Sequence, residues 1–371
     1  MEQIIRIGID TSKRIFQLHG VDGSEQPVLR KRLERRQMIP FFRKLPATRI
    51  GMEACGGSHY WARELAALGH EVVLLPPQHV KPYVRRGKHD AADAEAICEA
   101  MSRPRTRFAP VKTVDQQAAQ MLAGVREQLV RRRTQISNAI RGYAAEFGLV
   151  VGKGLAKLEP LLEGIAVEQS IPLLARELFD TLAQDYRAVR LRIVEVERKL
   201  MALHRGDATS RRLAQVPAIG PVGATLLSIK VADAKAFRSG RDFAAWIGLT
   251  PKNHSTAGKN RLGAITKAGD EALRRTLVVG AMAVIQQVQR RGSGPAWLVR
   301  LLQRKHASLA AVALANKTAR IAWKLMVSGE TYRAADPNSF APYSAPSRPL
   351  RAASGGGRRP ALTAPARVAP C

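Results

Sequence analysis

The sequence predicts a mixed α/β domain at its N-terminal end and an all-α remainder. Three observations carry this prediction. Short apolar runs separated by turn residues fill the first part of the chain, apolar residues then recur at steps of three and four, and the last segment is dominated by Pro, Ala, Ser, Gly and Arg. We therefore expect a sheet domain over residues 1–105, a long helical coiled-coil segment over 106–206, a mostly helical domain over 207–335 and a disordered basic tail over 336–371.

The first strands follow from Ile-rich runs. Residues 3–9 (QIIRIGI) end at Asp10, and residues 15–22 (IFQLHGVD) follow a short polar stretch, so the two runs predict a β-hairpin. Residues 26–33 (QPVLRKRL) are compatible with a third strand or with the lead-in to a helix, and both alternatives stay open.

A strand, a helix and another strand come next. Residues 47–54 (ATRIGMEA) predict a short buried strand, and residues 71–77 (EVVLLPP) predict a strand ended by two prolines. Between them, residues 58–70 have helical spacing, with Ser58 as a possible N-cap and Gly69 as the stop. This order of elements indicates a mixed sheet.

Two long helices are predicted beyond the sheet domain. Apolar residues keep steps of three and four over residues 118–147, apart from Arg132 at an expected core position, and again over 182–203. The two helices could form an antiparallel hairpin inside a bundle or a coiled coil between copies of the chain, and the pattern does not choose between these alternatives.

The charge of the chain points to a polyanionic partner. The 371 residues carry a formal net charge of +30 at pH 7, and 46% of them are hydrophobic, which is enough for a substantial core. No run approaches the roughly 18 apolar residues of a spanning helix, so nucleic acid is favoured over a membrane. The N-terminus does not resemble a signal peptide, and Cys55, Cys98 and Cys371 match no zinc or disulfide pattern, so we expect a cytoplasmic protein.

Four acidic residues are candidate metal ligands. Asp10 and Glu53 each end an apolar run, and Asp90 and Asp93 are three residues apart in residues 89–96 (HDAADAEA). A carboxylate at the end of a buried strand is costly without a cation, and two acids at this spacing share one helical face. The pattern predicts oxygen ligands for Mg²⁺, with Mn²⁺ as a possible substitute, in a two-metal phosphodiester-cleaving site. The alternative is that Asp90 caps a helix and Asp93 is a solvated surface acid.

Basic residues accompany these acids. Arg85, Arg86 and Lys88 directly precede Asp90, and a cationic cluster beside a carboxylate site suits docking of phosphates. A solvated loop would explain the same residues equally well.

Residues 216–224 (VPAIGPVGA) resemble a helix-hairpin-helix turn, in which backbone amides approach a phosphate. Gly220 and Gly223 are the candidate nucleic-acid contacts, but Ala218 stands where a second glycine is usual. A plain helical turn needs no nucleic acid and is an equally good interpretation.

Residues 253–270 (NHSTAGKNRLGAITKAGD) form a loop rich in small and cationic residues. Ser255 lies near Lys259, Arg261 and Lys267, which could dock a phosphodiester beside its hydroxyl. A serine hydroxyl is a weak nucleophile until it is activated. By residue type alone, Ser255 is an ordinary loop serine.

Taken together, these segments resemble a known family. The runs IGIDTSK, KHDAADA, PAIGPVGA and GLTPKNHSTAGKNRLGAITKAGDEALRR, with a Glu after a second short strand, are similar in content and order to the insertion sequence 110/1111 transposases over about residues 4–330. Family members commonly have Gly-Gly before the Lys, whereas this chain has Ala257–Gly258.

The resemblance implies an RNase H or RuvC-like fold with an acidic DEDD tetrad at Asp10, Glu53, Asp90 and Asp93, and a transposase domain with Ser255 as nucleophile. Thr256 is the neighbouring alternative. It also implies a recombinase that acts on double-stranded donor and target DNA, is guided by a structured non-coding RNA and forms a phosphoserine link. We further expect a homo-oligomer, a dimer or tetramer, located with the bacterial nucleoid.

Two other function classes stay open. A Holliday-junction resolvase or RNase H-like hydrolytic nuclease would share the tetrad and would not need Ser255. A non-catalytic nucleic-acid scaffold would need neither, and the complete set of acids argues against it.

Overall fold

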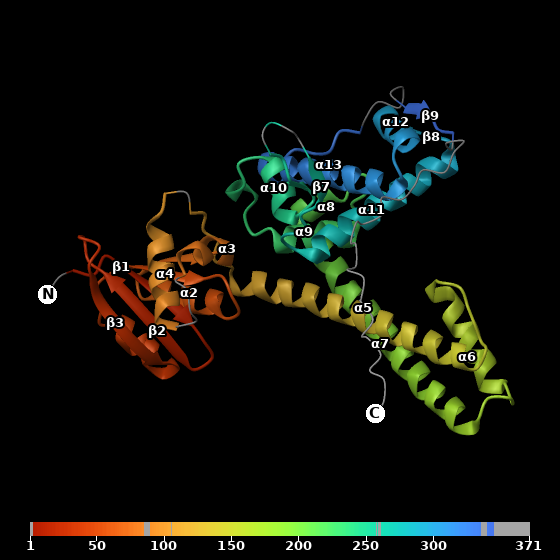
Figure 1. Ribbon diagram of the computed structural model, residues 1–371, viewed down its shortest axis with the longest axis horizontal. Helices are drawn as coiled ribbons and strands as arrows, with labels where there is room; N and C mark the ends of the chain where they lie inside the picture. The colour runs from red at the N-terminus through yellow and green to blue at the C-terminus, as the bar shows by residue number, and fades with distance from the viewer. Residues whose placement is uncertain are drawn as a thin grey trace, which may run out of the picture. The chain divides into compact units, whose positions relative to one another are not determined.

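The structure is a computed structural model that describes residues 3–84, 90–104, 106–256, 258, 261–334 and 340–344, with the side chain of Asp90 outside the description. The chain divides into two compact units, residues 1–122 and 123–371. Each unit is described by itself below (Figure 1).

The first unit is built on a five-stranded mixed sheet with strand order β3-β2-β1-β4-β5. Its strands are β1 (Arg6–Thr11), β2 (Ile15–Val21), β3 (Pro27–Glu34), β4 (Arg49–Glu53) and β5 (Glu71–Leu75). The first three strands are antiparallel, whereas β1, β4 and β5 run parallel. The predicted mixed sheet is therefore confirmed. Residues 26–33, for which a strand and the lead-in to a helix were both open, contribute most of the edge strand β3.

Helices cover both faces of this sheet (Figure 1). On one face α1 (Met38–Phe42) and α2 (Ser58–Ala67) enclose a core that contains Ile7, Ile9 and Phe16. On the other face α4 (Asp90–Ser102) packs through Ile97, Cys98 and Met101. The short helix α3 (Pro77–Val80) begins at the prolines that end β5. Alternate strand residues thus face two different apolar layers.

The start of α2 differs from the sequence prediction. Gly57, with φ of +88°, is the N-cap, and Ser58 is the first helical residue. The Ser58 hydroxyl donates a hydrogen bond back to the Cys55 carbonyl at 2.9 Å instead of accepting one from the helix. The tight turn needs a left-handed residue, which glycine supplies without steric cost. The stop at Gly69 is confirmed, since its N–H donates to the Ala66 carbonyl at 3.0 Å.

The two predicted long helices are present as α5 (Val114–Glu146) and α7 (Leu173–Gly206). Within the second unit their ion pairs join Arg126 to Glu197 and Arg132 to Asp185, so the two helices are antiparallel. Arg132 is exposed and bonds across the helix pair, which explains a cation at an expected core position.

A third helix completes the core of this helical segment. The helix α6 (Leu158–Val167), which the periodicity did not single out, shares one apolar cluster with α5 and α7 around the buried Tyr186.

The rest of the second unit is mostly helical. Its elements are α8 (Ala208–Leu213), α9 (Pro221–Lys230), α10 (Gly240–Ile247), β6 (Pro251–Asn253), β7 (Leu262–Ile265), α11 (Glu271–Arg291), β8 (Ser293–Pro295), α12 (Ala296–Arg304), α13 (Ala307–Ser328) and β9 (Phe340–Pro342). The strand β9 pairs with β8, so the predicted disorder from residue 336 onward does not hold for Phe340–Pro342. None of the described helices has the length and apolar character that crossing a lipid bilayer requires.

Candidate active site

The position of α4 on the sheet depends on two glycines. A Cβ atom at Gly8 would lie 2.2 Å from the Ala94 carbonyl oxygen, and one at Gly51 would lie 2.8 Å from the Met101 sulfur. Real Cβ contacts are never this short with backbone atoms, so a side chain at Gly8 would force the helix away from the sheet. The two glycines therefore allow α4 to approach β1 and β4 closely.

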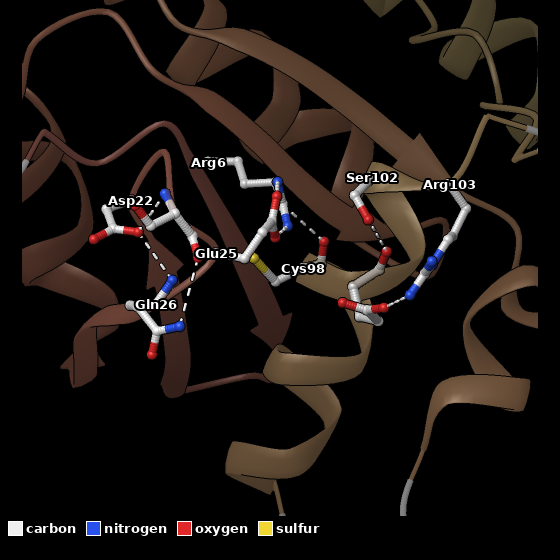
Figure 2. Close-up of polar contacts among 9 residues, drawn as sticks. Arg6, Asp22, Glu25, Gln26, Cys98, Ser102 and Arg103 are labelled. Atoms are coloured by element: carbon white, nitrogen blue, oxygen red, sulfur yellow. Dashed lines mark hydrogen bonds and ion pairs between the residues drawn. The ribbon is translucent and has the colours of Figure 1, made fainter.

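An arginine fixes the other half of the same helix (Figure 2). Arg6, at the start of β1, donates from Nε to the Cys98 carbonyl at 3.2 Å, and its Nη1 donates to Glu25 at 2.7 Å. The hydrogen bond from Arg6 holds the pKa of the Glu25 carboxyl below its usual range. Because Arg6 is mostly buried and bound on two sides, the C-terminal half of α4 is tied to the sheet.

These contacts set the direction of α4. Arg6 meets Cys98 and Gly8 meets Ala94, so the helix runs antiparallel to β1. Its N-terminal turn therefore lies toward the end of β1 that carries Asp10.

The two strand-end acids lie next to each other in the sheet. In the parallel pairing of β1 with β4, Ile9 is opposite Met52, and Asp10 and Glu53 follow directly on the two strands. Strand side chains alternate between faces, so Asp10 and Glu53 share the α4 face with Gly8 and Gly51. The prediction that these acids end neighbouring strands is confirmed.

The pKa of an acid in the sheet depends in part on an acid of α4. The pKa of Glu53 is raised, first by burial and then by the negative charge of Asp93. Asp10 and Glu53 are both half-buried. A Cβ at Gly51 would meet Ile97, so Glu53, two residues further along β4, lies toward Asp93, one turn earlier on α4.

Divalent metal is compatible with this group of acids. The described side chains alone form no group of three metal-ligating residues, and the side chain of Asp90 lies outside them. The donors are carboxylate oxygens, which Mg²⁺ and Mn²⁺ prefer. A cation between Glu53 and Asp93 would relieve the like-charge repulsion that raises the pKa of Glu53.

The predicted serine lies in a different setting, on the connection between β6 and β7. Ser255 donates from Oγ to the Asn253 side-chain oxygen and accepts from the Arg261 backbone N–H at 3.0 Å. Asn253 also accepts from the Ser255 backbone N–H at 2.9 Å. Asn253, which sequence reasoning missed, therefore fixes both the backbone and the hydroxyl of Ser255.

The segment after β7 is anchored to α10 by tight backbone contacts. A Cβ at Gly269 would lie 1.8 Å from the Trp246 carbonyl oxygen. Lys267 has a left-handed φ of +56°, and its N–H donates to the Gly248 carbonyl at 3.2 Å. The side chains of Lys267 and Arg261 are exposed, as phosphate contacts would be, whereas Lys259 lies outside the described residues.

The turn between α8 and α9 has the predicted helix–turn–helix arrangement. Ala218 has a left-handed φ of +76°, the conformation for which a glycine would be expected. Gly220 is the N-cap of α9. It lines an open groove of about 680 Å³, which Arg290 also lines. Gly223 is buried, and a Cβ there would lie 3.0 Å from the Thr276 methyl group. Gly223 packs against α11, and its contact with nucleic acid stays a prediction.

The remaining predicted phosphate contacts cannot be placed. Arg85, Arg86 and Lys88 lie outside the described residues.

Comparison with known proteins identifies the family. Residues 7–147 match a DEDD transposase family, and residues 210–294 match the transposase IS116/IS110/IS902 family. A putative transposase of Sinorhizobium fredii is 62% identical over 338 residues, which are 91% of this chain and 87% of the relative. The transposase for the insertion sequence element IS1328 of Yersinia enterocolitica is 39% identical, covering 90% and 99% of the two chains. The transposase for IS1111A of Coxiella burnetii is 35% identical, covering 90% and 92%.

The chain belongs to the IS110/IS116/IS902 family of transposases. The expected family resemblance is thereby confirmed, and the transposase is an enzyme that cuts and rejoins DNA. Its DEDD domain is of the RuvC-like type and indicates dependence on a divalent metal.

Proposed function

We propose that this insertion-sequence transposase cuts and rejoins DNA through a covalent link to Ser255, and that the acidic group of the sheet domain (Asp10, Glu53, Asp90 and Asp93) assists by holding divalent metal. The observation that supports the metal-holding role is the seating of α4, which directs Asp93 toward Glu53 at the end of the sheet where β1 carries Asp10. The side chain of Asp90, one turn before Asp93 on α4, is the proposed fourth ligand.

The acids would together hold Mg²⁺ or Mn²⁺, which would supply charge stabilisation to the scissile phosphate and to the attacking and leaving oxygens. Asp10 and Glu53 are held by the ladder between β1 and β4, and Asp93 is held by a helix that is bound at its far end by Arg6. Rigid elements of this kind maintain ligand positions better than loops do.

Ser255 would be the nucleophile that cuts the strand, and rejoining would reverse the same step. Its Oγ attacks the phosphorus, the bond from phosphorus to the departing deoxyribose oxygen breaks, and the serine proton passes to solvent or a base while that oxygen takes up a proton. Asn253 orients the Oγ–H bond, and the Arg261 N–H stabilises negative charge on the same oxygen. The phosphoester retained on the protein allows rejoining without an external energy source.

The proposed partners follow from the net charge of the chain and from the apolar side chains exposed on α7. The net charge of +30 and only 5% aromatic residues favour binding to nucleic-acid backbones over base stacking, which suits sequence selection by pairing with a guide RNA. Apolar side chains exposed along α7, such as Leu174, Leu178 and Leu191, support assembly into a homo-oligomer, a dimer or tetramer.

A trapping experiment tests the proposal. The wild type, Asp10→Asn, Ser255→Ala and Thr256→Ala are incubated with Mg²⁺, guide RNA and a nicked suicide DNA substrate, and covalent adducts are mapped by peptide mass spectrometry. We expect an adduct on Ser255 in the wild type and in Thr256→Ala, and none in Ser255→Ala. Asp10→Asn should lose cleavage while retaining its melting temperature. An adduct on Thr256 would show a different nucleophile, and cleavage without any adduct would establish the hydrolytic nuclease instead.

A further inference from the structure

The edge strand β3 carries cations on both faces of the sheet. Arg32 is opposite Gln17, and Arg30 is opposite His19, on the face that packs against α4. The intervening Lys31 instead places its ammonium group 5.0 Å from the centre of the Phe41 ring, which belongs to the other face. The two arginines therefore share one face with the acids of the candidate active site.

A groove of about 420 Å³ lies between these arginines and the first turns of α4. Its lining includes Gln17, Arg30, Lys31, Arg32, Ala91 and Glu95. The small alanine side chains at this end of α4 leave the arginines accessible, and Glu95 is the acid on the wall of the groove.

The groove is continuous with the acidic group along one row of the sheet. Asp10 pairs with Gln17, and Gln17 pairs with Arg32. With neighbouring strands about 4.8 Å apart, the Arg32 backbone is about 10 Å from that of Asp10. Successive phosphates of one strand are farther apart than the axial rise of about 3.4 Å per nucleotide, so a strand whose scissile phosphate sits at the acids would place a phosphate about one or two nucleotides away at the arginines.

Arg30 and Arg32 are accessible for contact with a phosphate. Both side chains are exposed, and neither forms an ion pair with a carboxylate among the residues that the structure describes. A guanidinium presents paired N–H donors that match a phosphate, and Gln17 adds an amide donor beside them.

We propose that Arg30 and Arg32, with Gln17, form a phosphate-docking groove for the DNA strand that is cut at the acidic group. This inference rests on the proposed function, because the acids locate the scissile phosphate. DNA is favoured over RNA as the occupant because the groove adjoins the residues assigned to DNA cleavage.

Binding measurements without metal test the groove separately from catalysis. Fluorescence anisotropy of a labelled DNA duplex from the element end is measured with the full-length protein in EDTA. The comparison is between wild type, Arg30→Gln/Arg32→Gln and the control Arg43→Gln/Lys44→Gln, which removes two exposed charges directly after α1, the helix that covers the opposite face. We expect roughly tenfold weaker binding for the Arg30→Gln/Arg32→Gln variant. Its log–log salt slope should become shallower by about two, one for each lost phosphate contact. The control variant should bind DNA nearly as the wild type does.

The position of the contact is tested by neutral methylphosphonates placed about one or two nucleotides from the cut. They should weaken binding by the wild type and add little to the loss in the Arg30→Gln/Arg32→Gln variant, since both changes remove one interaction. Equal binding by the Arg30→Gln/Arg32→Gln variant and the Arg43→Gln/Lys44→Gln control would overturn the proposal, as would a loss confined to guide RNA. If Asp10→Asn still cleaves DNA while the Arg30→Gln/Arg32→Gln variant binds it poorly, the groove stands and the metal-site proposal fails.

Discussion

The acidic group of the sheet domain and the loop that carries Ser255 are held in place by different kinds of contact. Asp10 and Glu53 end central strands of a five-stranded sheet, whereas Ser255 joins two short strands, of which β6 is entirely exposed. Asp10 and Glu53 are positioned by the β1–β4 pairing and Asp93 by the buried packing of α4. Ser255 is positioned by hydrogen bonds that it donates to Asn253 and by one that it accepts from the Arg261 N–H. Residues with few buried apolar contacts have low local stability. The difference indicates that the proposed metal ligands are held by the fold, while the proposed nucleophile depends on a local polar network.

The largest expected effect comes from filling the space at Gly8. In Gly8→Ala the new Cβ would meet the Ala94 carbonyl, so α4 must shift, and we expect a loss of about 3 kcal/mol in the stability of the sheet domain. Hydrogen exchange followed by mass spectrometry over β1 and α4 measures this loss. Gly23→Ala is the matched control, because no atom lies within 4 Å of its added Cβ. Equal hydrogen-exchange protection of β1 and α4 in the two variants would contradict this account, because packing at Gly8 would then not position α4.

Asn253→Ala should have an intermediate effect that is confined to the serine. The variant removes the acceptor that fixes the Ser255 hydroxyl, and losing one such orienting hydrogen bond should lower the rate of adduct formation roughly tenfold. Single-turnover kinetics on the suicide substrate measure the rate. Protection of β1 and α4 should be unchanged. If the sheet domain loses protection or the adduct forms at the wild-type rate, the two regions are not supported independently.

Glu25→Gln should have the smallest effect, and a pH-dependent one. The folded pKa of Glu25 is lowered by Arg6, so the ion pair stabilises the protein above the unfolded pKa of about 4.3, and this stabilisation is lost as pH falls through the folded pKa. Since the Glu25 side chain is 57% exposed, we expect a difference from wild type of no more than about 1 kcal/mol at pH 7. Urea denaturation at pH 7 and pH 3 measures it. A difference that persists unchanged at pH 3 would contradict an ionic origin.

Local patterns were sufficient to predict the strands and their acids. The runs that end at Asp10 and Glu53 are apolar enough to mark buried strands, and the acids mark their ends. The long helices followed from periodicity alone, including Arg132 as an exception, which the structure explains by Asp185.

Features that depend on distant segments were not predictable. Gly8 looks like any strand glycine until α4, more than eighty residues later, packs against it. The N-cap of α2 is Gly57 and not Ser58, because the turn needs a left-handed backbone. Asn253 has no sequence signal beyond its place two residues before Ser255, and the groove beside β3 exists only once the strand is paired and α4 is seated.

The most direct test of the central claim is whether the acids share a divalent cation. Isothermal titration of Mn²⁺ into the metal-free transposase compares wild type, Asp93→Asn and Asp115→Asn, the last an exposed acid in the first turn of α5 that serves as a charge-matched control. We predict metal binding in wild type and Asp115→Asn, and at least about tenfold weaker binding in Asp93→Asn, because one ligand is neutralised. Identical isotherms for the three proteins would contradict the assignment of Asp93 to a metal site.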